Sequence, residues 1–339
     1  MIKKIAWTLL VIFILIALTY LVGPKATFNK VNNTPKEALI DIDKVESYID
    51  DTESSLTKIK PDNQSQVIWQ DSTKKTEYAV LYLHGYSASH GECQPILENF
   101  SERYRCNTYL HRLKDHGLND DDAFANVTPE RLVESAKEAV AIAKNLGEKL
   151  LIISTSTGCT LATYLAAADS DIKAIIMTAP NFDLYDQNSH LMLKPWGKQI
   201  LKKIVGSKYR TWEATPEAQQ YWTTKNRIEG LIAMRSLLDQ TMTDEIFSKI
   251  NVPVFVGYYY KDADNQDEII SINAIKEFQQ KISTPTENQM FIPFATAKGH
   301  VISSKYMNPN WKEVQDSIFV FAEDILKLPV ADIRGNSVN

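Results

Sequence analysis

Short, fully apolar runs alternate with helical periodicities along most of the chain. Runs of this kind suit strands that are covered on both faces of a sheet, and apolar residues that recur every three to four positions indicate helices packed against it. The alternation predicts one doubly wound α/β domain. The predicted strands cover residues 78–83, 150–153, 174–178, 252–256 and 290–294, and the predicted helices cover 129–146 (capped by Thr128), 161–168, 270–282 and 311–326.

The segment 182–250 breaks this alternation, because it has no convincing strand and shows helical stretches at 197–205 and 227–238. Its position between two core strands predicts a helical cap that covers the functional site and sets substrate choice. The charged stretch from Lys194 to Lys208 is typical of a solvated face, with docking onto anionic lipid as the alternative. The large side chains of this segment either line the site or pack only the cap's own small core. They are Trp196, Trp212, Trp222, Met192, Met234 and Met242.

The N-terminus carries an apolar segment long enough to cross a membrane. As a helix, residues 5–22 would extend roughly 27 Å, near the thickness of a bilayer core. This is longer than the core of a cleavable signal peptide, and no small-residue cleavage site follows. Residues 1–24 are therefore predicted as an uncleaved anchor, with a removed signal peptide as the alternative. Lys3 and Lys4 favour a domain exported to the periplasmic or extracellular side, although Lys25 and Lys30 flank the other end.

The remaining boundaries follow from polarity. Residues 25–64 are polar and typical of a stalk, with one amphipathic stretch at 36–49. The main domain then covers 65–328, and residues 329–339 form a C-terminal tail.

Composition excludes several classes of function. The chain has 339 residues, 44% hydrophobic and 23% charged, as in an ordinary globular protein, and its net charge of −5 gives no footprint for nucleic acid. No glycine-rich phosphate loop is present, and no histidine pair has the spacing of a zinc protease. Three cysteines exclude a disulfide scaffold, although Cys93 and Cys106 flank a predicted helix and could pair after export, and Cys159 is expected to be a buried small hydrophobe.

The clearest candidate for chemistry is Ser156. The run 150–153 leads into it through Ser154, and Gly158 follows two residues later. Small residues two before and two after a serine allow a sharp strand-to-helix turn that exposes its hydroxyl, as a nucleophile requires. Ser154 replaces the usual first glycine of that pattern. Serines after apolar runs most often only cap a helix, so the assignment needs a base, an orienting acid and oxyanion donors as well.

Two backbone amides are the expected oxyanion donors. The strand 78–83 ends in His84 and Gly85, and the glycine lets the chain turn so that the N–H of Tyr86 points in front of Ser156. The amide of Thr157, which begins the next helix, is the second donor. The alternative is that His84 and Gly85 form only a strand-ending turn.

His300 is the candidate base. Among the six histidines it lies well downstream of Ser156, in a strand-then-turn setting, and Gly299 gives its ring freedom to swing over a site. His84 is expected to organise its loop. The other four lie in polar stretches and are predicted to be mostly at the surface: His90, His111, His116 and His190.

The orienting acid should follow the strand 252–256. Asp267 is preferred, because a turn before the helical pattern at Ile269 would fix its carboxylate. Asp262, which comes directly off the strand, is the reserve, and Asp264 or Glu268 remain open. Acids at the start of a helix are more often caps or solvated charges.

With these residues in place, the chain resembles the α/β-hydrolase superfamily, and within it the esterase, monoacylglycerol-lipase and serine-aminopeptidase-like branch. The resemblance covers residues 65–328 and implies a mostly parallel sheet flanked by helices, the chain order Ser156, Asp267, His300, an acyl-enzyme and no cofactor. Two departures are Ser154 and the extended acidic loop 262–267. The matching pieces are His84-Gly85-Tyr86, residues 113–117, 154–158, 267–271 and Gly299-His300-Val301.

The expected function is that of a membrane-tethered serine hydrolase, a carboxylesterase or lipase, that cleaves a small-molecule carboxylic ester without a metal. The same fold hosts serine peptidases, thioesterases and carbon–carbon hydrolases, so the bond and the acyl chain remain open. The alternative from another class is a non-catalytic binding module. Intact Ser156 and His300 argue against it, because such a module has no physical need for both.

Overall fold

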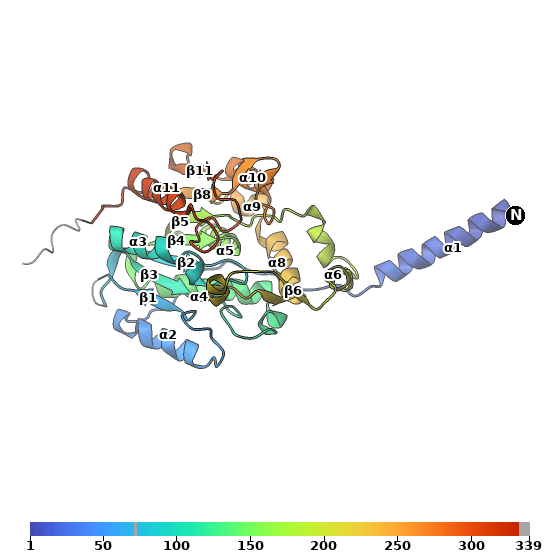
Figure 1. Ribbon diagram of the computed structural model, residues 1–339, viewed down its shortest axis with the longest axis horizontal. Coiled ribbons are helices and arrows are strands. Elements are labelled where there is room, and N and C mark those ends of the chain that lie inside the picture. The colour runs from blue at the N-terminus through green and yellow to red at the C-terminus, as the bar shows by residue number, and fades with distance from the viewer. Residues whose placement is uncertain (71–72, 332–339) are drawn as a thin grey trace, which may run out of the picture.

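Seven strands form one sheet at the centre of the molecule (Figure 1). The computed structural model describes residues 1–70 and 73–331. The strand order is β1-β3-β2-β4-β5-β8-β11, and every neighbouring pair is parallel except β1 with β3. The strands are β1 (Gln66–Ile68), β2 (Thr76–Leu83), β3 (Asn107–His111), β4 (Gly147–Thr155), β5 (Ile172–Thr178), β8 (Val254–Tyr258) and β11 (Gln289–Pro293).

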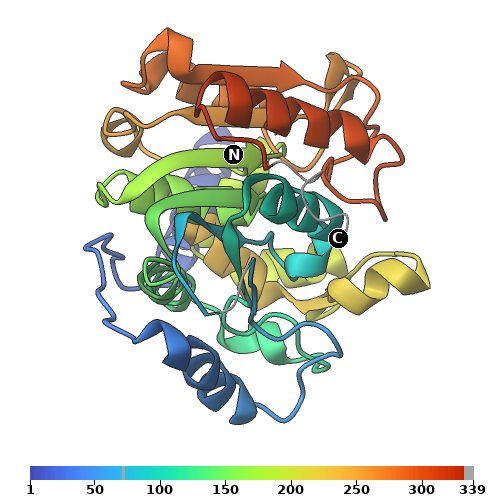
Figure 2. The same cartoon turned by 90° about the vertical axis from the view of Figure 1, so that its left-hand side faces the viewer.

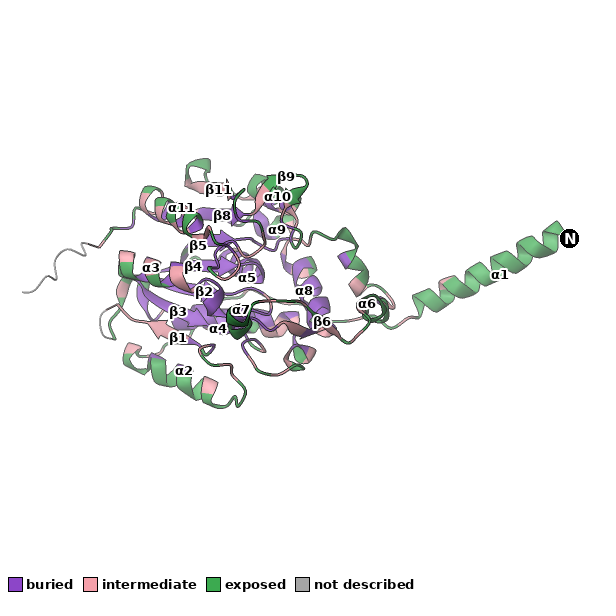
Figure 3. Ribbon diagram, in the orientation of Figure 1, coloured by how far each residue is buried: buried purple, intermediate pink, exposed green. Residues whose placement is uncertain are grey.

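Helices cover both faces of this sheet, as Figures 1 and 2 show. One face packs on α4 (Pro129–Ala143), α5 (Thr157–Ala166) and α10 (Ile272–Lys281). The other face packs on α3 (Gln94–Tyr104) and α11 (Trp311–Asp324). The middle of β4 is apolar at consecutive positions because both of its faces are covered: Ile152 and Ile153 are both fully buried, one in each layer. Figure 3 shows the strands at the centre of the sheet coloured as buried.

The predicted α/β fold with a mostly parallel sheet is confirmed. The five predicted strands correspond to β2, β4, β5, β8 and β11, and Thr128 caps α4 by accepting a hydrogen bond from the amide of Arg131. Strands β1 and β3 were not predicted. Strand β3 escapes prediction because it contains polar residues: Asn107 and Thr108 are buried there although neither is hydrophobic.

The inserted cap is mainly helical, with one correction. It contains η4 (Gln187–Leu193), α6 (Gly197–Val205), α7 (Pro216–Tyr221), α8 (Ile228–Thr241) and α9 (Asp244–Phe247). It also contains an antiparallel hairpin of β6 (Tyr209–Thr211) and β7 (Lys225–Arg227), so the prediction of a segment without strands was wrong. Three-residue strands are too short to produce a detectable periodicity.

Helix α1 (Ile2–Leu21) projects away from the body and has no buried residue (Figures 1 and 3). By length and composition it is long and apolar enough to cross a membrane. Its C-terminal end contacts the cap. The indole N–H of Trp196 donates to the carbonyl of Thr19 at 3.1 Å, and its amide donates to the carbonyl of Pro24 at 2.9 Å.

The segment 25–64 is not a free stalk along its length. It contains η1 (Ile42–Lys44) and α2 (Val45–Ser54), and Val45 and Ile49 are buried in the main core. The amphipathic stretch seen in the sequence is the reason, because its apolar side has the body to pack against. Of the predicted C-terminal tail, residues 332–339 lie outside the described residues.

Candidate active site

Ser156 lies on a strained turn between β4 and α5. Its backbone has φ +53° and ψ −116°, a conformation that is costly for a residue other than glycine and that recurs at functional sites. The Ser156 amide donates to the carbonyl of Thr178 at 3.0 Å, and the amide of Cys159 donates to the carbonyl of Ser156 at 2.9 Å. The Ser156 side chain makes no capping hydrogen bond within the described chain. The hydroxyl is therefore available for other partners.

The small residues around Ser156 serve the turn in different ways. A Cβ at Gly158 would lie 1.9 Å from the carbonyl oxygen of Leu83, so only glycine lets α5 approach β2 this closely. Ser154, at the position of the usual first glycine, is fully buried, and its hydroxyl lies 3.4 Å from the carbonyl of Ile176. Because that buried hydroxyl has an acceptor, the departure from glycine is accommodated.

His300 lies between Ser156 and Asp267. Its Nε2 is 2.9 Å from Ser156 Oγ, and its Nδ1 is 2.6 Å from Asp267 Oδ2. Burial acts to lower the pKa of His300, but the charge and hydrogen bond of Asp267, with the charge of Glu92, outweigh it and raise the pKa above its ordinary value. The structure thus brings together the three side chains that the sequence offered as nucleophile, base and acid.

The two candidate acids have different surroundings. Asp267 is buried, and its Oδ1 accepts hydrogen bonds from the amides of Ile269 at 2.8 Å and Ile270 at 3.3 Å. Asp262, the reserve, is exposed and accepts hydrogen bonds from Asn265 at the β9–β10 turn instead. The strands of that turn are β9 (Tyr260–Asp262) and β10 (Asn265–Gln266). The extended acidic loop therefore places only one of these two carboxylates beside His300.

The two expected oxyanion donors both have free amides. Within the described chain, neither the N–H of Tyr86 nor that of Thr157 donates to a protein acceptor. Thr157 is the first residue of α5, where backbone N–H groups have no partner inside the helix. The amide of Thr157 follows the Ser156 hydroxyl directly in the chain, and Tyr86 lines the cavity in front of it.

A second carboxyl group, Glu92, reaches the same place and was not among the predicted site residues. It lies in η2 (His90–Glu92), is 1% exposed, and its Oε1 accepts hydrogen bonds from the amide of Gly85 at 2.5 Å and the hydroxyl of Tyr82 at 2.9 Å. Burial raises the pKa of Glu92 to about 7, although these two donors and the charge of His300 oppose the shift. No local pattern marks such a glutamate, because only the folded chain brings it to the serine.

The remaining histidines correct the prediction of surface positions. His90, His111 and His116 are buried, and only His190 of the four is exposed. His111 ends the unpredicted strand β3, and its Nε2 lies 2.8 Å from the Ser135 hydroxyl. Loops that are polar in sequence cover these rings in the fold.

His84 has the expected organising role. Its Nε2 accepts a hydrogen bond from the amide of Leu113 at 2.9 Å, and its Nδ1 lies 2.9 Å from the carbonyl of Gly85. Burial lowers its pKa well below the usual value, so the ring is neutral, with its proton on Nδ1 and donated to Gly85. His84 therefore fixes the turn that carries Tyr86.

Ser156 opens into a cavity of about 550 Å³ beneath the cap. We call it the Ser156 cavity. Met192, Met234, Trp212 and Trp222 line it, which is one of the two alternatives left open for the cap's large side chains. Met242 lines a different hollow, and Trp196 contacts α1. The Ser156 cavity also includes a cation, Arg210, from the β6–β7 hairpin.

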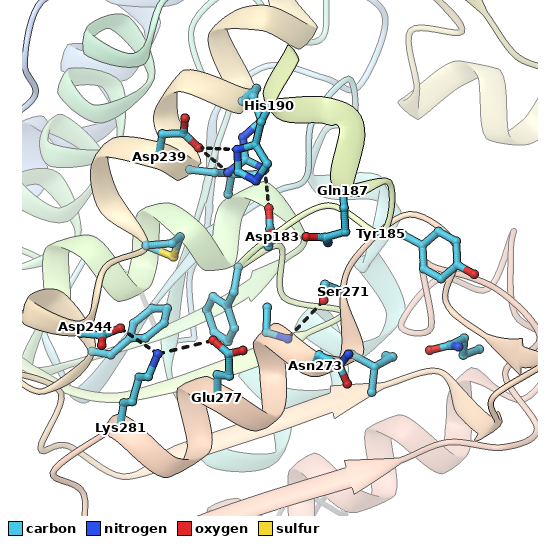
Figure 4. A pocket seen from close by; sticks show the side chains of 18 residues that line it. Asp183, Tyr185, Gln187, His190, Asp239, Asp244, Ser271, Asn273, Glu277 and Lys281 are labelled. Carbon is cyan, nitrogen blue, oxygen red and sulfur yellow. Dashed lines mark hydrogen bonds and ion pairs between the residues drawn. The ribbon is translucent and has the colours of Figure 1, made fainter. Parts of the chain in front are cut away.

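The larger hollow, about 770 Å³, lies between η4, α8, α9 and α10 (Figure 4). Its charged groups neutralise one another: Arg235 contacts both Asp183 and Asp239, and Lys281 contacts Asp244 at 2.7 Å. Neither Ser156 nor His300 lines it. The hollow therefore contains ion pairs and no pairing of nucleophile and base.

The cysteines form no disulfide. Cys93, Cys106 and Cys159 are all free and buried. Cys93 and Cys106 do flank α3, but they are not joined, so the proposed pairing is not present. Cys159 is fully buried beneath the turn, as expected for a small hydrophobe. Within residues 1–70 and 73–331, no group of three His, Cys, Asp or Glu side chains is arranged to hold a metal ion.

Comparison with known proteins shows which solved structures have a similar fold. No family model and no curated protein sequence matches the chain. Among solved structures, the chain is similar to a metagenome-derived lipolytic enzyme from work on LipS and LipT, with a TM-score of 0.60 and 10% identity over 78% of this chain and 98% of that one. It is also similar to the monoacylglycerol lipase of Paleococcus ferrophilus, with a TM-score of 0.53 and 14% identity over 76% and 98% of the two chains.

A third similar structure is Est1E from Butyrivibrio proteoclasticus with bound ferulic acid, at a TM-score of 0.50 and 16% identity over 80% of this chain and all of that one. These proteins share the α/β-hydrolase fold. At such low identities the likeness establishes that this chain has the same fold, and the chemistry must be argued from its own residues.

Proposed function

We propose that this protein is a membrane-tethered serine hydrolase that cleaves a carboxylic ester through an acyl-enzyme on Ser156. The observation that carries the proposal is the pair of contacts made by one imidazole, 2.9 Å to the Ser156 hydroxyl and 2.6 Å to the Asp267 carboxylate. A serine hydroxyl is a weak nucleophile at neutral pH, and an adjacent base is what activates it.

The first half of the reaction follows from these contacts. His300 Nε2 takes the proton of Ser156 as its Oγ attacks the ester carbonyl, and the resulting imidazolium is stabilised by Asp267 at Nδ1. The amides of Tyr86 and Thr157 stabilise the oxyanion of the tetrahedral intermediate. When the intermediate collapses, His300 returns the proton to the leaving alcohol, and the acyl group stays on Ser156.

Hydrolysis of the acyl-enzyme repeats the sequence with water. His300 takes a proton from water as the water oxygen attacks the acyl carbon, the same amides stabilise the second oxyanion, and the proton returns to Ser156 Oγ as the acid leaves. Every step uses the protein's own groups, so the proposal requires no metal or cofactor.

The Ser156 cavity supports an ester as the substrate class. Its apolar lining of methionine and tryptophan side chains suits a small-molecule acyl or alkyl group better than an extended polar backbone. The lipolytic and esterase activities named for structures of the same fold agree with this choice. A serine peptidase or thioesterase would use the same machinery and differs only in the leaving group.

Helix α1 supports the membrane tether. Its 20 residues span about 30 Å as a helix, the thickness of a bilayer core. The contacts of Trp196 with Thr19 and Pro24 bring the cap to the end of this helix. Lys3 and Lys4 at the other end favour a catalytic domain on the exported side, the periplasmic or extracellular one, although Lys25 and Lys30 flank the helix on that side.

The test is turnover of a p-nitrophenyl ester by the full chain and by Ser156→Ala. The replacement should lower kcat by several orders of magnitude while leaving the fold intact by circular dichroism. Undiminished turnover by the alanine variant would refute the proposal. Folded wild-type protein that neither hydrolyses esters nor reacts with a fluorophosphonate probe would instead support the non-catalytic binding module.

A further inference from the structure

Glu92 belongs to a buried chain of polar groups beneath the three residues of the proposed site. Its Oε1 lies 2.9 Å from the hydroxyl of Tyr82, and that hydroxyl lies 3.0 Å from Thr155 Oγ1. Thr155 Oγ1 in turn lies 2.9 Å from Thr178 Oγ1, which lies 3.3 Å from Ser303 Oγ. The chain thus connects the segment of Glu92, the residue before Ser156 and the loop that carries His300.

The hydrogen bond between Glu92 and Gly85 orients the backbone of the turn that follows β2. The Gly85 amide donates to Glu92 Oε1, so the plane of the His84–Gly85 peptide is fixed. The next peptide along the chain carries the Tyr86 amide. A Cβ placed on Gly85 would lie 3.2 Å from Ser156 Cβ and 3.3 Å from Glu92 Oε2, so the carboxylate and the serine lie on the same side of the turn. Buried polar groups of this kind are retained only when hydrogen bonds satisfy them.

We propose that Glu92 is a positioning residue: its side chain fixes the turn that presents the Tyr86 amide and, when ionised, favours the imidazolium form of His300, which lines the same cavity. The inference rests on the proposed function of Ser156 and adds a second acid to it. Asp267 orients His300 from Nδ1, whereas Glu92 acts through the oxyanion turn and through space. The titratable groups that face Glu92 are Tyr82, Cys93, Cys159 and His300, with Asp267 beyond the imidazole.

Two substitutions separate the charge of Glu92 from its role as a hydrogen-bond acceptor for the turn. Glu92→Gln keeps an oxygen that can accept from Gly85 and Tyr82 but removes the charge, so the pKa of His300 should fall. The acid limb of kcat/KM should move to lower pH together with that pKa. Glu92→Ala also removes the acceptor for the Gly85 and Tyr82 hydrogen bonds. Its kcat should fall about 100-fold with little change in KM, as when one oxyanion donor is lost. Glu98→Gln, on the exposed side of α3, is the matched control and should change neither value.

The pKa of His300 is read from side-chain NMR of histidine-labelled protein, which needs no turnover. An unchanged His300 pKa in Glu92→Gln, together with wild-type kcat in a folded Glu92→Ala, would overturn the inference. If Glu92→Ala does not fold, the Glu92→Gln titration decides alone. Absence of ester turnover in the wild type would count against the proposed function, while the titration would still decide the role of Glu92.

A different observation concerns the substrate. Arg210 is half-buried in the Ser156 cavity, and among the described residues no carboxylate lies within ion-pair distance of its guanidinium. Three polar atoms of this lining are buried without a hydrogen-bond partner in the described chain: the hydroxyls of Tyr86 and Thr157 and Oδ1 of Asn181. The positive charge of Arg210 acts on the first of these hydroxyls, since it opposes the rise that burial causes in the pKa of Tyr86.

We also infer that the Ser156 cavity takes an ester whose acyl or alcohol part carries a carboxylate, with Arg210 as its counter-ion. One planar guanidinium matches one carboxylate with two parallel hydrogen bonds. A doubly charged phosphate fits less well, because the exposed rim carries Asp186 and Glu268. This inference also rests on the proposed function and makes its substrate class narrower.

The test uses p-nitrophenyl half-esters of dicarboxylic acids, from succinate to suberate, each paired with the neutral acyl ester of the same carbon number. Wild-type kcat/KM should favour at least one half-ester over its neutral partner by about tenfold, and Arg210→Gln should remove that preference. Lys208→Gln removes a charge directly before the same hairpin and outside the cavity, so this variant should keep the preference for the half-ester.

No preference in the wild type, or a preference that survives Arg210→Gln, would overturn this inference and leave the esterase proposal standing. If no ester is turned over, calorimetric binding of the paired esters to Ser156→Ala, with and without Arg210→Gln, decides the role of Arg210. The missing turnover would then count against the proposed function.

Discussion

Asp267→Asn tests the geometry of the proposed site through a change of one atom. Asp267 Oδ1 accepts from the amides of Ile269 and Ile270, and Oδ2 faces His300 Nδ1 at 2.6 Å. In the asparagine variant the two backbone donors still require an oxygen at the first position. The side-chain NH₂ must therefore occupy the second position and donate to Nδ1.

The consequence is the wrong tautomer of the base. His300 Nδ1 becomes an acceptor, its proton moves to Nε2, and Nε2 can no longer take the proton of Ser156. An equivalent change in a Ser-His-Asp site lowers kcat about 10⁴-fold, which corresponds to about 5 kcal/mol in the barrier. The fold should survive, because the asparagine keeps the hydrogen bonds to the loop.

The assay is kcat for a p-nitrophenyl ester at saturating substrate, with thermal unfolding as the check on folding. Asp262→Asn is the control, because that carboxylate bonds to Asn265 at the surface and should leave kcat unchanged. A folded Asp267→Asn that keeps kcat within tenfold of the wild type would refute this reasoning. A large loss in Asp262→Asn instead would show that the acid had been misassigned.

Three further predictions follow from the same contacts. Because His300 must be neutral to accept a proton and its pKa is raised, kcat/KM should fall as pH drops through a value above 6.5; an acid limb below 6 in a pH–rate profile would contradict this. Gly158→Ala places a Cβ 1.9 Å from the Leu83 carbonyl oxygen and should lower stability by at least about 1–3 kcal/mol, measured by thermal unfolding; an unchanged midpoint would be inconsistent with the close approach of α5 to β2. Burial raises the pKa of both Cys93 and Cys106 to about 12, so iodoacetamide should label them only after unfolding; rapid labelling of the native protein would mean that these thiols are exposed.

The sequence predicted those features that depend on local chemistry. The turn at Ser156 needs small residues on both sides, and the carboxylate of Asp267 is fixed by amides two and three residues further along. Such requirements leave a pattern in neighbouring positions. The apolar strands were predictable for the same reason, because a strand covered on both faces must be apolar at consecutive positions.

Features that depend on distant partners could not be predicted in this way. Glu92 lies in the short helix η2, and only the fold brings it to Gly85 and Tyr82. Strand β3 was missed because Asn107 is polar yet buried, and its side-chain amide is satisfied by the carbonyls of Lys74 and Leu146. Periodicity does not detect a polar residue whose partners lie 30 or more positions away.

The central claim is that a covalent bond forms between substrate and Ser156, and mass spectrometry of the acylated protein tests it most directly. A slowly deacylating ester, quenched in acid during turnover, should leave its acyl mass on the peptide that contains Ser156, and on no other peptide. Ser156→Ala should carry none. Continued hydrolysis with the label on a different residue, or with no covalent adduct under conditions that trap acyl-enzymes, would contradict the account.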